Sequence, residues 1–224
     1  MDTIIHEEIK EIKKSLRLSM NGIVSAHQRR QGLNYKINFG VEIPRLKEIA
    51  STHKKKKLLA QNLWKENIRE CKLLAIFLYP TEEFDSTTAE QWIAECTFTE
   101  IADHLCRTLL AETVGATKSS LQWIARKEDI FEYCGYCTLS NLFTKKVTLS
   151  GEDEKRYYNV LKQTLHVPGT SSNPTKNAAH ISLIKFAEQN KEQSKRVCNE
   201  IKSWGIEKNT TLSNLVVNLF DEAD

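Results

Sequence analysis

Glycine and proline are scarce in this sequence, with 8 Gly and 4 Pro among 224 residues. This is roughly half of their combined share in an average globular protein. The scarcity excludes collagen-like and elastic repeats, and because both residues interrupt helices it favours long helices joined by few turns. Apolar residues make up 40% of the chain and charged residues 27%. This balance allows a sizeable buried core and excludes intrinsic disorder.

Long apolar runs are also missing. The longest stretches, such as 73–78 and 215–219, fall far short of the ~18–20 residues that a membrane span requires. The N-terminus, MDTIIHEEIKEIKK, mixes acidic and basic residues and lacks the uninterrupted apolar core of a secretory signal. The six cysteines are scattered rather than dense, which predicts reduced, buried thiols. We therefore expect a cytoplasmic protein that does not associate with membranes.

An excess of charge of one sign is nearly absent as well. The chain has 32 Lys and Arg against 29 Asp and Glu, a net charge of +3. Such a mild excess favours a nucleic-acid partner only if the basic residues gather on one face.

Helical periodicity is present almost everywhere. Ile5, Ile9, Ile12 and Leu16 recur at spacings of four, three and four, which predicts one apolar stripe on a helix. Pro44 is typical of the first turn of a second helix, and Thr87 with Glu90 resembles a capping box that starts another. No period-2 strand pattern is convincing. Further helices are predicted at 58–64, 68–79, 99–111, 119–126, 130–144, 152–165, 174–189, 193–202 and 210–220, with a Gly/Pro/Ser loop at 167–175 in which Asn173 caps the next helix.

Weak internal repeats favour a solenoid over a compact bundle of these helices. Trp64, Trp92 and Trp123 recur at spacings near thirty residues, each ahead of another helix. Irregular similarity at a few tens of residues is typical of divergent HEAT or armadillo repeats. We therefore predict an all-α superhelix, or solenoid, of HEAT/armadillo-like repeats that forms a single domain over residues 1–224.

The order of four segments resembles the AlkD-like DNA alkylation repair family. These segments are NFGVEIPRLKEIA (38–50), LWKENIRECKLLAIFL (63–78), WIAECTFTEIADHL (92–105) and QWIARKEDIFEYC (122–134). Members begin with a Gly-hydrophobic-x-x-Pro entry, continue with a Leu-Trp and Arg-Glu helix pair, and place a functional aspartate in the next helix. The resemblance covers about residues 38–190.

This resemblance implies a HEAT-repeat solenoid whose concave basic surface grips duplex DNA. Active members are monofunctional glycosylases that hydrolyse the N-glycosidic bond of N3- or N7-alkylated purines. The alkylated base is a good leaving group, and a carboxylate stabilises the cationic sugar that its departure creates. The resemblance implies no cofactor and no metal, and no oligomer, so we expect a monomer that is associated with the nucleoid when it binds DNA.

The family aspartate corresponds to Asp103, the candidate catalytic residue. Helical rotation places Asp103 away from the apolar face of Ile101 and Leu105, where it can reach DNA. An i,i+4 ion pair with Arg107 is the alternative role for this side chain. The candidate DNA-binding residues are Phe98, Arg107, Lys118, Arg126, Lys127, Tyr133, Tyr136, Lys145 and Lys146.

Three positions depart from the family pattern. Thr99 stands where active members have Trp, and Cys134 stands where they have a phosphate-binding Arg. Ile181 corresponds roughly to a later Trp that forms part of the aromatic cage around the damaged base. These changes weaken cation–π contact with a charged base and remove one phosphate contact. A second hypothesis therefore stays open: a non-catalytic scaffold that uses the same groove to bind a protein or an undamaged or branched nucleic acid.

Other patterns favour ordinary structural roles. The four lysines at 54–57 suit either phosphate binding or a solvated helix entrance. Cys134 and Cys137 match C-x-x-C but lack the strand of a redox motif and the second pair of a zinc site, so packing is favoured. The sequence lacks metal-ligand spacing among its histidines, a phosphate-binding glycine loop and a G-x-S-x-G elbow.

Overall fold

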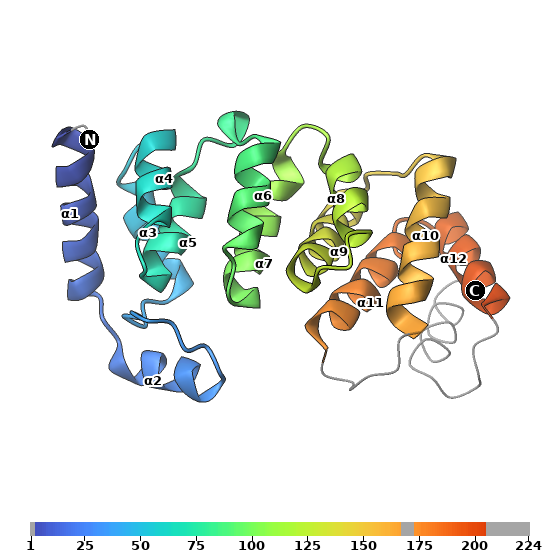
Figure 1. Cartoon of the computed structure of the whole chain (residues 1–224), viewed down its shortest axis with the longest axis horizontal. Coiled ribbons are helices and arrows are strands. Elements are labelled where there is room, and N and C mark those ends of the chain that lie inside the picture. Colours follow the sequence, from blue (N-terminus) through green and yellow to red (C-terminus); the bar gives the residue numbers. More distant parts are fainter. Residues whose placement is uncertain (1–2, 167–172, 205–224) are drawn as a thin grey trace. The chain divides into compact units, whose positions relative to one another are not determined.

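The computed structural model describes residues 3–166 and 173–204, and within these ranges the regular structure is helical (Figure 1). The α-helices are α1 (Thr3–Leu18), α2 (Gly22–Arg30), α3 (Ile43–Ser51), α4 (Lys57–Trp64), α5 (Arg69–Leu78), α6 (Ser86–Ala94), α7 (Thr99–Thr108), α8 (Ala116–Ile124), α9 (Asp129–Thr144), α10 (Gly151–His166), α11 (Pro174–Ala187) and α12 (Lys191–Ser203). Short 3₁₀ turns lie at Thr81–Glu83 and Leu110–Glu112. The β pairing in the described part is an isolated bridge between Ile37 and Ile68. The predicted all-α class is confirmed.

Several local predictions hold, one is wrong, and helix α2 (Gly22–Arg30) was not predicted. Ile5, Ile9, Ile12 and Leu16 form the buried stripe of α1. Pro44 lies in the first turn of α3, and the Asn173 side chain caps α11 by accepting a hydrogen bond from the Thr175 amide. Thr87, however, does not begin its helix. Asp85 is the N-cap of α6 and accepts from the Thr88 amide at 2.7 Å, so the helix begins at Ser86. Residues 167–172 of the predicted loop and the predicted helix at 210–220 lie outside the described residues.

The helices form two compact units, residues 1–113 and 114–224. The predicted tryptophan repeat marks corresponding places in the helix pairs of both. Trp64 ends α4, Trp92 lies in the last turn of α6 and Trp123 in the last turn of α8, and each is followed by the second helix of its pair. All three indole rings are about 2% exposed. The spacing near thirty residues is therefore the length of one helix pair.

In the first unit, α5 is the central helix and packs against α3, α4 and α7. Eight of its ten residues are buried, among them the charged Arg69 and Glu70. Beside it, the rings of Trp64 and Trp92 stack with centroids 4.0 Å apart and planes 2° from parallel. The edges of Tyr79 and Phe84 close against Trp92. This aromatic cluster joins α4 to α6.

In the second unit, α9 is the central helix and packs against α8 and α11. Gly135 lets α8 and α9 approach closely, because a Cβ atom at this position would lie 2.6 Å from Ile124 Cγ2 and 2.9 Å from the Ser120 carbonyl oxygen. The rings of Phe143, Tyr157 and Phe186 join α9, α10 and α11. The unit is thus built around a helix that is covered on most sides.

The cysteines are free thiols, and five of the six are buried. Cys134 is fully buried and Cys137 partly so, which agrees with packing of this pair rather than redox chemistry. Burial raises the pKa of the Cys71 and Cys96 thiols to about 12. No described helix is long and apolar enough to cross a membrane.

Candidate nucleic-acid interface

Helix α7 carries the candidate carboxylate. Its buried face consists of Ile101, Ala102, Leu105 and Cys106. Asp103 is half-buried on the other side of the helix, as its helical rotation predicts, and Arg107 is exposed in the last turn. The Asp103 carboxylate therefore lies on the polar side of α7.

A buried ion network supports the start of α7 and was not predicted from the sequence. The Arg69 side chain, only 2% exposed, donates from two nitrogens to the Glu100 carboxylate, including a 2.9 Å bond from Nε. Arg69 also donates to the Val41 carbonyl oxygen and to Glu70. Tyr35 completes the network by donating to Glu100 at 2.8 Å. The network ties α5 and α7 to the segment between α2 and α3.

The Glu70 carboxylate holds the same segment from the other side. It accepts hydrogen bonds from the amides of Phe39 and Val41 at 3.1 and 3.3 Å. The Arg-Glu pair that contributes to the family resemblance thus has a structural role here. Both ions are buried in a site where charge-assisted hydrogen bonds satisfy them.

Electrostatics keep Arg69 and Glu100 ionised. Burial opposes the charge of Glu100, but the hydrogen bonds and charge of Arg69 outweigh it and lower the pKa of this carboxyl. Burial likewise opposes the charge of Arg69, and its bonds and attraction to Glu100 and Glu70 outweigh it and raise the guanidinium pKa. Burial and the Glu100 charge raise the pKa of Tyr35, which stays a neutral donor.

His104 is a neutral neighbour of Asp103. Burial and the positive charge of Arg107 lower its pKa, and the opposing effects of Glu100 and Asp103 are smaller. Its ring meets Phe77 edge to face, with centroids 5.8 Å apart. Because an imidazole with a lowered pKa is uncharged near neutral pH, His104 adds no positive charge to this surface there.

The candidate aromatic residues are mostly unavailable at the surface. Phe98 precedes α7 and is half-buried, with its ring 4.5 Å from the Tyr35 ring centroid. Tyr133 is 9% exposed and Tyr136 fully buried. The Tyr136 hydroxyl is hydrogen-bonded to Thr164 at 2.9 Å, and burial raises its pKa. Burial therefore argues against the expected placement of Tyr133 and Tyr136 beside a nucleotide, because both rings of α9 pack the second unit.

The candidate basic residues of the second unit lie at helix ends and are exposed. Lys118 is in α8, Arg126 and Lys127 follow it, and Lys145 and Lys146 follow α9. Arg126 lies 3.7 Å from the Phe131 ring centroid and pairs with Glu128. Lys146 donates to the carbonyl oxygens of Glu188 and Gln189, so it caps the end of α11. Of these five basic side chains, Lys118 and Lys127 make the fewest hydrogen bonds and ion pairs within the described part of the chain.

The lysines at 54–57 have mixed roles. Lys56 pairs with Glu8, which also contacts His53, and Lys57 lies 3.7 Å from Asp85. Lys54 and Lys55 are exposed. Part of this run therefore serves to connect α1, α4 and the start of α6.

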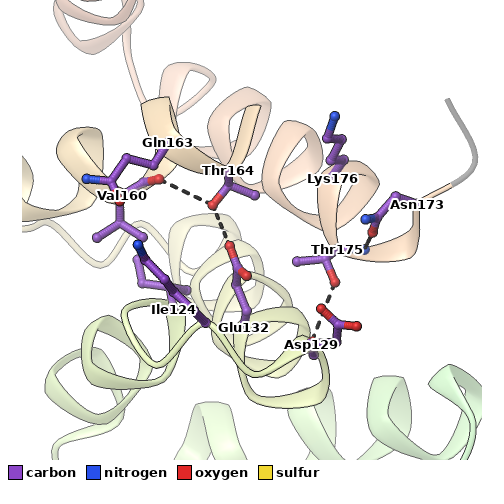
Figure 2. A pocket seen from close by; sticks show the side chains of 10 residues that line it. Ile124, Asp129, Glu132, Val160, Gln163, Thr164, Asn173, Thr175 and Lys176 are labelled. Carbon is purple, nitrogen blue, oxygen red and sulfur yellow. Dashed lines mark hydrogen bonds between the residues drawn. The ribbon is translucent and has the colours of Figure 1, made fainter. Parts of the chain in front are cut away.

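A pocket of about 250 Å³ opens in the second unit between the starts of α9 and α11 (Figure 2). The Glu132 carboxylate points across it to α10 and accepts a hydrogen bond from Thr164. Thr175 at the start of α11 donates to the Asp129 carbonyl oxygen at 3.4 Å. Lys127 and Lys176 also line the pocket, so its walls carry two acidic and two basic side chains on an apolar floor of Ile124 and Val160.

The three positions that depart from the family pattern have different environments. Thr99 is half-buried in the first turn of α7, and Cys134 is fully buried. Ile181 is 50% exposed on α11. A phosphate contact from position 134 is sterically excluded, because its side chain faces the core of the second unit.

The helix pairs and their repeated tryptophans define an α-solenoid of HEAT-like repeats, and comparison with known proteins agrees. A family model described as "DNA alkylation repair enzyme" matches residues 12–195. The chain belongs to this DNA alkylation repair family. A solved structure described as "a new family of proteins related to the HEAT-like repeat DNA glycosylases with affinity for branched DNA structures" has 18% sequence identity and a TM-score of 0.76. The alignment covers 95% of this chain and 94% of that one, so the two share a fold. No curated protein sequence matches this chain significantly.

Proposed function

We propose that this protein binds duplex and branched DNA through its polar helix surfaces and recognises DNA without excising a base. The burial of Tyr133 and Tyr136 is the observation that argues against base excision. Ring faces attract a cationic base, and enzymes that extrude a base hold it between aromatic or apolar side chains. These two rings pack the protein core instead. Phe98 is engaged with Tyr35. Family membership and the described affinity of the structural neighbour for branched DNA support the proposed binding of duplex and branched DNA.

DNA binding should depend steeply on salt. Each phosphate that a Lys or Arg neutralises releases condensed counterions, so the logarithm of the binding constant falls linearly with the logarithm of salt concentration. Arg107→Gln should reduce this slope by about 1, as measured by fluorescence anisotropy with a duplex and a four-way junction between 50 and 300 mM NaCl. Lys195→Gln, an exposed lysine of α12, is the control and should leave the slope unchanged. Salt-independent binding, or no binding to either DNA, would refute the proposed function.

Base excision is the second candidate function, favoured by the position of Asp103 on the polar side of α7. In this reaction the N-glycosidic bond breaks and its electron pair neutralises the charge of the departing alkylpurine. Water then adds to the sugar cation and loses a proton, while the Asp103 carboxylate stabilises the cation. The neutral His104 beside it brings no competing positive charge near pH 7.

Excision is tested by incubating N7-methylguanine duplex DNA with wild type and Asp103→Asn and measuring the released base chromatographically. The proposed function predicts no release above the rate without protein. Release by wild type that falls at least tenfold in Asp103→Asn, but not in the control Asp153→Asn on α10, would instead establish the second candidate. Release that is insensitive to Asp103→Asn would contradict both the proposal and the assigned role of Asp103.

A further inference from the structure

A long basic segment lies between residues 12 and 41. This segment contains Lys13, Lys14, Arg17, Arg29, Arg30 and Lys36 and not one Asp or Glu. Its formal charge is therefore +6, although the whole chain carries only +3. Lys13 pairs with Glu66. The other five side chains are exposed. Such a segment complements a polyanion.

The same segment exposes three large apolar side chains within six residues. Leu18 at the end of α1 is 80% exposed, Met20 in the following link 58%, and Ile23 in the first turn of α2 81%. Other exposed apolar side chains of the described ranges, such as Val114 and Ile181, stand apart from one another in the sequence. We call Leu18, Met20 and Ile23, with the exposed Arg17, Arg29 and Arg30 of the same two helices, the α1–α2 surface.

Polar contacts hold α2 in place without covering these apolar side chains. Ser25 is the one buried residue of this fully described helix, and its hydroxyl donates to the Asn38 carbonyl oxygen at 3.0 Å. The Asn21 side chain caps α2 by accepting from the amides of Ile23 and Val24. Gly40, at φ +71°, packs so closely that a Cβ atom there would lie 2.2 Å from the Asn21 carbonyl oxygen. In Figure 1, α2 runs across the direction of α1 and α4.

The buried ion network fixes the segment on which α2 rests. Glu70 binds the amides of Phe39 and Val41, and Arg69 binds the Val41 carbonyl oxygen. The backbone that anchors α2 is therefore tied to the core of the first unit, while Leu18, Met20 and Ile23 stay exposed. A preorganised surface loses little conformational entropy on binding.

We propose that the α1–α2 surface recognises the branch point of DNA. Leu18, Met20 and Ile23 stack against base pairs that are exposed where strands diverge, and the surrounding arginines bind the flanking phosphates. Linear duplex DNA offers such open base faces only at its ends, so the apolar contacts select branched DNA, whereas the arginines bind both forms. This inference rests on the proposed DNA binding and assigns the selectivity to particular residues.

An anionic membrane also attracts basic and apolar side chains, but the geometry favours DNA. A helix that lies in a membrane interface buries a long apolar face. Helix α2 has nine residues and presents Ile23 among polar and basic side chains. Leu18, Met20 and Ile23 lie within six residues of chain at the α1–α2 link, a short apolar stretch that suits a single base step better than a lipid layer.

The test compares a four-way junction with a linear duplex of equal length and composition, using fluorescence anisotropy at several salt concentrations. Leu18→Gln/Ile23→Gln should weaken junction binding about five- to tenfold, because contacts with unstacked bases are lost, and should change duplex binding less than twofold. Arg29→Gln/Arg30→Gln should weaken binding to both and lower the salt slope by about 2. Val114→Gln, which replaces a fully exposed valine elsewhere, is the matched control. All these residues are exposed, and unchanged thermal unfolding confirms intact folding.

The outcomes separate this inference from the proposed function. If wild type binds neither DNA in a salt-dependent way, the proposed function fails and the inference fails with it. If wild type binds both and Leu18→Gln/Ile23→Gln keeps its junction-to-duplex affinity ratio, only the inference is overturned. Loss of binding to vesicles with anionic lipid in this variant, with an unchanged DNA affinity ratio, would assign the surface to a membrane and also overturn it.

Discussion

Replacing Arg69 by methionine should lower the free energy of unfolding by about 3–5 kcal/mol, the usual cost of leaving a buried charge without its partner. Arg69 is almost fully buried and binds Glu100, Glu70 and the Val41 carbonyl oxygen. Methionine fills similar space but leaves both carboxylates without a counter-ion. Urea unfolding followed by circular dichroism measures the loss.

Two further variants distinguish the ion network from simple packing. Arg69→Met/Glu100→Gln removes one of the uncompensated charges and should recover part of the stability that Arg69→Met loses. Arg45→Ala removes a partner of Glu48 in an exposed pair and should cost at most about 1 kcal/mol. A double variant as unstable as the single one, or an Arg69→Met variant as stable as wild type, would contradict this account.

Replacing Trp92 by alanine should cost a similar amount, about 3–5 kcal/mol, because it opens a large cavity in the first unit. The Trp92 ring stacks on the Trp64 ring with centroids 4.0 Å apart, and it makes edge-to-face contacts with the rings of Tyr79 and Phe84. The Trp64 indole is also held by a 2.6 Å hydrogen bond to Glu95, so it cannot readily move to fill the space. The free energy of unfolding from urea titration measures the effect.

Two controls accompany the Trp92 prediction. Trp92→Phe keeps an aromatic ring and should lose clearly less stability than Trp92→Ala. Ile181→Ala truncates a half-exposed side chain and should change the free energy of unfolding by less than about 1 kcal/mol. A Trp92→Ala loss no greater than that of Ile181→Ala would show that the stacked pair does not stabilise the first unit.

Most helices and their pairing could be predicted because they depend on local patterns. Helix α2, which has one buried residue and no apolar stripe, was not predicted. The stripe from Ile5 to Leu16 follows the helical period, and the three tryptophans recur once per helix pair. The error at Thr87 also has a local cause. Asp85 lies two residues earlier, and its carboxylate caps the helix by binding the Thr88 amide. Two capping candidates two residues apart cannot be ranked by spacing alone.

The candidate site was only partly predictable. The polar position of Asp103 follows from the clear apolar face of α7. Tyr133 and Tyr136 could not be placed in this way, because nine of the sixteen residues of α9 are buried and the helix has no single apolar face. Arg69 and Glu100 are 31 residues apart, and no local pattern connects them.

The sequence by itself determined that this protein is all-α, that its helices pair in repeats marked by tryptophan, and that it resembles DNA alkylation repair proteins. These properties rest on periodicity, propensity and motif order, which act over a few turns of chain. Only the tertiary structure decided that the aromatic candidates of α9 are buried, that Arg69 joins Glu100, and that α2 presents Leu18, Met20 and Ile23 to solvent. Burial and ion pairing depend on which helices meet, and that is set by packing between residues distant in the sequence.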